Sequence, residues 1–99
     1  MKRYKLIINP FAELDLQTTK EWYDLQREGL SDELITEIDK TLNRIKENPL
    51  QFRYIKKKIR MAIINRFPFG IFYYVKGEVI NVFAIFHFSR NPKIWKKRI

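Results

Sequence analysis

The chain of 99 residues contains no cysteine and only one histidine. Without thiols it can form neither a disulfide framework nor a thiolate metal site, and one imidazole cannot make a multi-histidine metal centre. Its apolar runs are far shorter than a bilayer requires, and the basic amino terminus has an apolar run of only three residues, 6–8, which excludes a secretory signal. We therefore expect a cytoplasmic protein that uses no metal, no other cofactor and no membrane.

Acidic residues are scarce in one half of the chain only. Residues 51–99 carry twelve lysines and arginines against a single acid, Glu78, whereas residues 1–50 carry eight basic and ten acidic side chains. The formal charge of +9 at pH 7 therefore consists of +11 in the second half and −2 in the first. Such a one-sided surface attracts polyanions, either nucleic acid or an acidic protein segment, and charge alone does not separate the two.

Apolar residues, by contrast, are plentiful. Hydrophobic residues make up 45% of the chain and aromatic residues 15%, which excludes intrinsic disorder of the whole chain. A chain of this length has room for one core and a radius of gyration of ~13 Å. We expect a single domain over residues 1–99.

The first half predicts a strand and a helical hairpin. Residues 4–8 form a short apolar run closed by Asn-Pro, and residues 11–28 are rich in helix formers with a broad apolar face that includes Trp22, which we assign to the core. Gly29 is a natural end for that helix, and Ser31 is a natural N-cap for a second helix. Apolar residues at spacings of three and four continue that helix until Asn48-Pro49 ends it.

The second half predicts strands. β-Branched and aromatic residues gather at about 58–66, 69–76 and 79–88, with a weaker segment at 52–56. The short break at 76–78 predicts an antiparallel hairpin, and residues 93–99 form a basic tail long enough for one helical turn. The fold class is therefore α+β: an N-terminal strand, a two-helix hairpin, and a three- to four-stranded antiparallel sheet with helices on one face.

Strict alternation along the strands assigns side chains to the two faces of this sheet. In the last strand it places Phe86 with Val82 against the helices, and His87 on the open face. In the strand before it, alternation places Phe72 and Tyr74 on the open face, where exposed apolar surface would await a partner.

These elements resemble a known family. The residues that carry the resemblance are Asp15, Trp22-Tyr23, Ile38-Asp39, Asn48-Pro49, Arg60, Phe67-Pro68-Phe69, Ile71-Phe72-Tyr73 and the run from Val82 to Trp95. The chain is similar to the RelE/ParE superfamily of type II toxin–antitoxin toxins over nearly its whole length. The resemblance implies a small bacterial toxin whose antitoxin wraps it with an acidic or amphipathic segment and blocks its working surface.

Members of this superfamily differ in target. By the resemblance, RelE-like members cut messenger RNA in the ribosomal decoding site, and ParE-like members inhibit DNA gyrase. RNA cleavage needs an activated 2′-hydroxyl, a protonated leaving oxygen and a stabilised phosphorane. The nuclease branch places an arginine for this work just after an aromatic residue at the start of the strand before the hairpin, where this chain has Gly70 after Phe69. Gly70 therefore favours a ParE-like toxin without hydrolytic activity.

The alternative is a ribosome-dependent endoribonuclease. Arg90 falls where that branch has a basic catalytic residue, and His87 lies near a histidine that some of those enzymes use. A histidine there is equally at home in ParE-like sequences, where a structural or partner-contact role is expected. The antitoxin's identity and the oligomeric state stay open.

Candidate contacts to an antitoxin or target complete the prediction. They are Lys56, Lys57, Lys58, Arg60, Phe72, Tyr74, Arg90 and Trp95. The lysine run with Arg60 is either a solvated sheet edge or a binding surface, since edge lysines also discourage aggregation. Trp95 either stacks on a base or packs the tail back onto the sheet.

Overall fold

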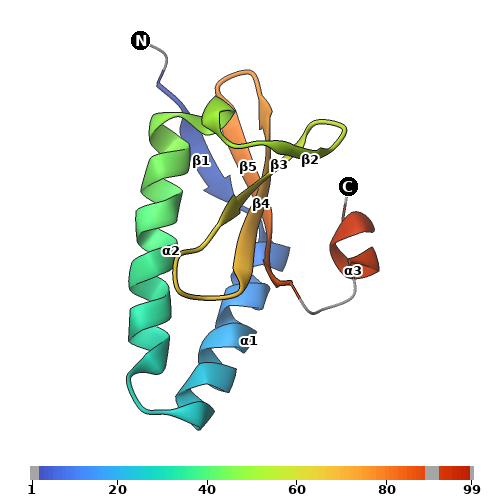
Figure 1. Cartoon of the computed structure of the whole chain (residues 1–99). Helices are drawn as coiled ribbons and strands as arrows, with labels where there is room; N and C mark the ends of the chain where they lie inside the picture. Colours follow the sequence, from blue (N-terminus) through green and yellow to red (C-terminus); the bar gives the residue numbers. More distant parts are fainter. Residues whose placement is uncertain (1–2, 89–91, 99) are drawn as a thin grey trace.

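One five-stranded sheet with a helical hairpin on one face forms the body of the protein (Figure 1). The computed structural model describes residues 3–88 and 92–98. In chain order its elements are β1 (Lys5–Ile8), α1 (Pro10–Gln26), α2 (Leu30–Glu47), the 3-10 turn η1 (Pro49–Gln51), β2 (Tyr54–Lys56), β3 (Ile59–Ile63), β4 (Phe69–Lys76), β5 (Val79–His87) and α3 (Lys93–Lys96). The α+β class and the order of elements agree with the prediction.

The sheet is mixed rather than purely antiparallel. Its strand order is β1-β5-β4-β3-β2, with β1 parallel to β5 and every other neighbour antiparallel. The N-terminal strand therefore joins the predicted antiparallel strands as a fifth member. A parallel pair needs a long crossover, and the α1–α2 hairpin with β2–β4 supplies it.

The ends of the two helices are set by local chemistry. The Asn9 side chain accepts a hydrogen bond from the Ala12 N–H at 3.1 Å, and Pro10 occupies the first turn of α1. The predicted N-cap Ser31 is wrong: α2 begins at Leu30, and Gly29 is its N-cap in a left-handed conformation with φ 82°. Glycine adopts that conformation without the penalty that a Cβ atom brings, so α2 begins two residues earlier than expected.

Only part of the apolar face of α1 packs against the sheet. Ala12 and Tyr23 are buried there, whereas Trp22 is 55% exposed, so its assignment to the core is wrong. Phe11, Leu14 and Leu25 are exposed as well. The apolar arc of α1 is wider than one contact surface, and the Ala12–Tyr23 side occupies the available contact.

A β-bulge in β5 changes which side chains face the helices. Phe72 pairs with Ala84 and Tyr73 with Val82, which leaves Phe83 as an extra residue in β5. Alternation reverses at such a residue. The prediction for Phe86 is therefore wrong, because Phe86 lies with Phe83 on the face away from α1 and α2, whereas β4 keeps the predicted alternation.

Candidate functional site

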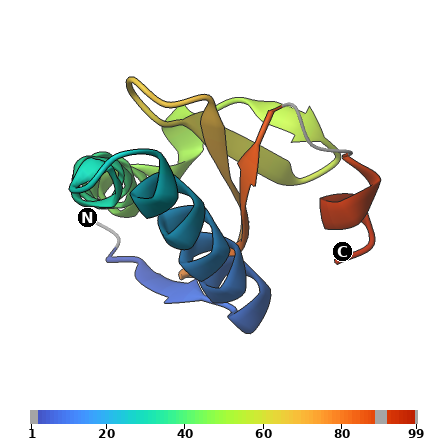
Figure 2. The same ribbon diagram turned by 90° about the horizontal axis from the view of Figure 1, so that it is seen from below.

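The face of the sheet opposite the α1–α2 hairpin is covered by α3 (Figure 2). Trp95 of α3 is 6% exposed, and its ring centroid lies 4.7 Å from that of Phe72 and 6.3 Å from that of Phe83. Of the two roles predicted for Trp95, packing the tail onto the sheet is the one the structure has. Phe72, predicted as exposed, is only 5% exposed because Trp95 lies over it. We call this aromatic group, with Phe86 and Ile59, the α3-covered cluster.

A buried ion pair ties the carboxyl end of the chain to α1. Arg98 donates two hydrogen bonds to the Asp15 carboxylate, at 2.6 and 3.0 Å, and a third to the Phe83 carbonyl at 3.1 Å. The Ile85 N–H donates to the same carboxylate at 3.1 Å. Both side chains are nearly buried, at 12% and 7% exposed. The ion pair fixes α3 against the sheet. Its carboxylate also accepts a hydrogen bond from the Ile85 N–H of β5, beyond the residues of β5 that pair with β1.

Sequence reasoning assigned no role to Asp15 or Arg98. The two residues lie 83 positions apart, so no local pattern connects them. One signal was present: Asp15 lies among the sheet-facing residues of α1, and a buried carboxylate there requires a partner. The chain offers twenty lysines and arginines as possible partners, and spacing does not rank them.

A small cleft opens beside the α3-covered cluster. Its volume is about 220 Å³, and its walls include Met61, Phe72, Phe86, His87 and Trp95. Among the described residues that line this cleft, His87 is the only one with an ionisable side chain. The described part of the lining is therefore largely apolar.

Gly70 lies close to this cleft and is packed tightly. A Cβ atom on Gly70 would lie 2.9 Å from both Cγ and Sδ of Met61 and 3.1 Å from a ring carbon of Phe72. These distances are shorter than van der Waals contact, so any side chain at this position requires its neighbours to move. The space that an arginine would need is filled by Met61.

The histidine does not lie where alternation placed it. His87 is half-buried and packs edge to face on Phe69, with ring centroids 4.9 Å apart, and Phe69 belongs to the core beneath α1 and α2. The bulge at Phe83 is the cause, since it moves His87 to the helix side of β5. The other catalytic candidate, Arg90, lies outside the residues that the structure describes.

The basic candidates of the β2–β3 hairpin divide into two groups. Lys56, Lys57 and Lys58 are exposed, and the Lys58 ammonium lies 5.4 Å from the centre of the Tyr74 ring, which is half-buried beside the α3-covered cluster. Arg60 instead donates hydrogen bonds to the carbonyls of residues 50 and 52 and lies 3.8 Å over the Tyr54 ring. Arg60 therefore holds the chain after α2, while the three lysines stay available to a partner.

No group of three or more metal-ligating side chains occurs within residues 3–88 and 92–98. No helix in that part of the chain is long and apolar enough to cross a membrane.

Comparisons with known proteins identify the family. No curated protein sequence matches the chain. Among solved structures, the chain is similar to one titled "Chromosomal ParDE TA system from P. aeruginosa", with 18% identity, a TM-score of 0.77, and coverage of 86% of this chain and 96% of that one. At that identity the likeness shows the fold. Residues 6–92 match the family described as "ParE toxin of type II toxin-antitoxin system, parDE", and the chain accordingly belongs to the ParE toxins.

Proposed function

We propose that this protein arrests bacterial growth by inhibiting DNA gyrase, does not cut RNA, and is neutralised by a cognate antitoxin. The target follows from the resemblance to ParE-like toxins, and the family supports that branch. The alternative from the same superfamily is cleavage of messenger RNA on the ribosome, with His87 and Arg90 as catalytic residues.

The residues that line the cleft beside the α3-covered cluster favour gyrase inhibition over RNA cleavage. RNA cleavage requires cationic donors aimed at the phosphorane, and losing one such donor typically costs ~10²- to 10³-fold in rate. Apart from His87, the residues of the described chain that line this cleft are apolar. Position 70, where the nuclease branch has an arginine, is a glycine, and a Cβ atom there would require the Met61 side chain to move. His87 packs edge to face on Phe69.

Two assays on the purified toxin test the target. We expect inhibition of gyrase in a supercoiling assay and no cuts in ribosome-bound message by primer extension. Codon-phased cuts that appear only with the toxin would reject the gyrase assignment in favour of the endoribonuclease.

A variant separates the two mechanisms further. Glutamine keeps hydrogen-bonding groups but has no titratable proton near pH 7, so His87→Gln should remain toxic if no proton transfer occurs. Thermal unfolding of the variant should first be shown to match that of the wild type. A folded His87→Gln protein that has lost all toxicity would contradict the proposal.

Neutralisation by an antitoxin is tested by co-expressing the neighbouring gene. We expect a small acidic protein encoded beside this gene, and its co-expression should restore growth. The contacts we propose for its binding are exposed Lys56, Lys57 and Lys58, together with half-buried Tyr74, whose ring lies beneath the Lys58 ammonium. Growth arrest that persists with every adjacent reading frame expressed would reject this part.

A further inference from the structure

One side of α1 carries a stripe of large apolar side chains that stay exposed. Phe11, Leu14, Trp22 and Leu25 are 54, 64, 55 and 84% exposed, and the exposed Thr18 lies between them. At 3.6 residues per turn these five positions fall within an arc of roughly 80° on the helix. We call these five residues the α1 stripe.

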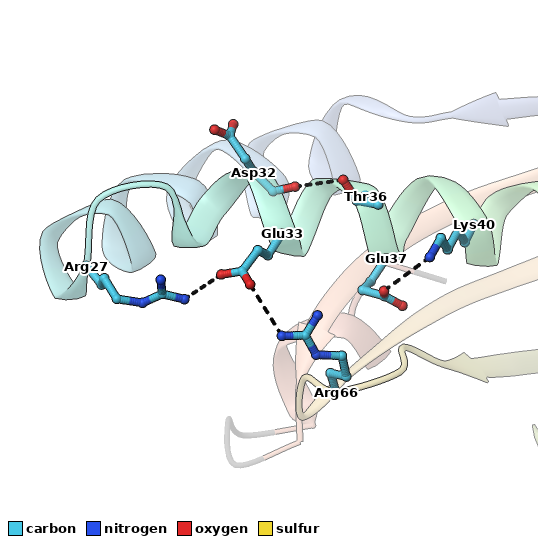
Figure 3. A network of polar contacts seen from close by, with 7 residues as sticks. All are labelled: Arg27, Asp32, Glu33, Thr36, Glu37, Lys40 and Arg66. Atoms are coloured by element: carbon cyan, nitrogen blue, oxygen red, sulfur yellow. Dashed lines mark hydrogen bonds and ion pairs between the residues drawn. The ribbon is translucent and has the colours of Figure 1, made fainter.

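Contacts with neighbouring residues hold this surface in place. The Trp22 ring packs edge to face on the Tyr23 ring, with the centroids 4.9 Å apart. At the carboxyl end of α1, Arg27 pairs with Glu33 of α2, which Arg66 also contacts at 3.4 Å (Figure 3). These contacts fix the largest side chain of the stripe and the turn between the two helices. A partner therefore meets a surface that is already ordered, which lowers the cost of binding.

The spacing of the α1 stripe is the same in both directions along the helix. Its steps are three, four, four and three residues, so the pattern is symmetric about Thr18. When two copies of α1 lie antiparallel with Thr18 facing Thr18, Phe11 of each copy meets Leu25 of the other, and Leu14 meets Trp22. Every large apolar side chain then has an apolar counterpart, as a two-fold interface between identical chains requires.

The area of the α1 stripe is sufficient for such an interface. Its four large side chains expose about 500 Å² per copy, so covering them in both copies buries roughly 1,000 Å². That area is at the lower limit for a specific interface between proteins. A tryptophan with apolar neighbours is also the kind of side chain that contributes most to binding at interfaces.

The charges on α1 favour a second copy over an acidic partner. The fully exposed charged residues of this helix are Glu13, Glu21 and Asp24, all acidic, and they disfavour nucleic acid or an acidic segment. Of these acids, Glu21 is the nearest to the α1 stripe. In the antiparallel pair it lies beside Leu14 and Gln17 of the other copy, so it does not meet an acid there. Antiparallel packing also opposes the two helix dipoles, which is favourable.

We propose that the toxin forms a two-fold homodimer through antiparallel packing of its α1 stripes. This inference does not depend on the gyrase assignment, because it rests on the surface of α1 alone. An interface of this size predicts a dissociation constant in the micromolar range. Because each copy carries a formal charge of +9, dimerisation should strengthen as the salt concentration rises.

Sedimentation equilibrium of the full-length toxin measures the dimer. Leu14→Glu with Leu25→Glu should weaken dimerisation at least about 100-fold, because it places carboxylates against apolar side chains. The matched control is Leu50→Glu with Ile63→Glu, which changes two apolar residues outside α1 that are 55 and 59% exposed. The control should alter the dissociation constant less than about threefold. Both double variants should unfold thermally like the wild type, since all four side chains are exposed.

The absence of cysteine from the chain allows the geometry to be tested by crosslinking. Thr18→Cys lies on the proposed two-fold axis and should crosslink to its twin with a short bismaleimide. The two thiols of a Leu25→Cys dimer would lie about 21 Å apart along the helices, so this variant should not crosslink to itself. It should instead crosslink to Phe11→Cys when the two proteins are mixed.

Each possible result decides the proposal. A wild-type toxin that stays monomeric well above the micromolar range would overturn it, and so would a dimer that the α1 variant leaves intact or that weakens with salt. Equal loss in both double variants would show non-specific adhesion and would also overturn it. Self-crosslinking of Leu25→Cys as efficient as that of Thr18→Cys would reject the antiparallel arrangement. If the toxin alone is monomeric and a co-expressed adjacent gene product protects Thr18→Cys from maleimide, the α1 stripe belongs to the antitoxin and the homodimer fails.

Discussion

Breaking the Asp15–Arg98 ion pair should destabilise the protein strongly because the pair is nearly buried. The Asp15 carboxylate accepts from two guanidinium nitrogens and from the Ile85 N–H, and both charged side chains are almost excluded from water. Asp15→Ala leaves the Ile85 N–H unpaired and leaves a nearly buried guanidinium with the Phe83 carbonyl in place of its counter-ion, which typically costs about 3 to 5 kcal/mol. Against a total stability of roughly 5 to 15 kcal/mol, such a loss is large.

The partner variant should behave differently. Arg98→Ala leaves the carboxylate its bond from Ile85 N–H, so we expect about 2 to 3 kcal/mol, less than for Asp15→Ala. In the double variant neither group is left without its partner, so the two losses should not add, and a coupling energy of about 1 to 3 kcal/mol should remain.

Urea unfolding of the wild type, both single variants and the double variant measures this coupling. Asp24→Ala is the control, because Asp24 is an exposed aspartate on the same helix and should change the free energy of unfolding by less than about 0.5 kcal/mol. Single effects that sum to the double effect within about 0.5 kcal/mol would refute the reasoning that the two side chains stabilise each other.

Three further outcomes are expected. Tyr73→Phe should lower the free energy of unfolding in urea by about 1 to 2 kcal/mol, because the buried hydroxyl donates to the Pro49 carbonyl. Burial also raises the pKa of Tyr73, so this tyrosine should ionise last in a spectrophotometric titration. Hydrogen bonding and charge from Arg27, helped by Arg66, lower the pKa of Glu33 below its usual 4.5. The difference in melting temperature between wild type and Glu33→Gln should therefore be complete above pH 4.5 and should shrink as the pH falls through the lowered pKa. A difference in melting temperature that does not depend on pH would contradict this. Phe86→Ala should cost about 3 to 5 kcal/mol, because Phe86 is 2% exposed under α3, and a loss below 1 kcal/mol would show that the site collapses around the cavity.

The sequence predicted most of the fold because its signals are local. Each strand and both long helices are marked by their own periodicity and by turn residues, and the alternation in β4 correctly separates Phe72 from Tyr73. The same rule failed in β5, because a bulge inserts Phe83 and nothing in a run of apolar residues marks where such an insertion falls.

Predictions that depended on contacts distant in sequence were less successful. Trp22 belongs to an apolar arc wider than the surface that α1 buries, and periodicity cannot decide which part of that arc meets the sheet. The prediction that Phe72 is exposed did not take the C-terminal residues 93–98 into account. In the structure Trp95 lies over the Phe72 ring and covers it. The hollows between α2 and β3 are lined by residues from a helix, a loop and a strand, so no single segment of the sequence predicts them.

The parallel pairing of β1 with β5 has a consequence for how the toxin is made. Residues 5–8 are synthesised well before their pairing partners, residues 79–82, so β1 has no neighbouring strand until β5 has followed it. Contacts of such long sequence separation form slowly. An incomplete chain that ends before β5 exposes the apolar side of the α1–α2 hairpin with no central strand to cover it. The toxin fold therefore closes only after β5 has been synthesised, although both long helices precede it in the chain.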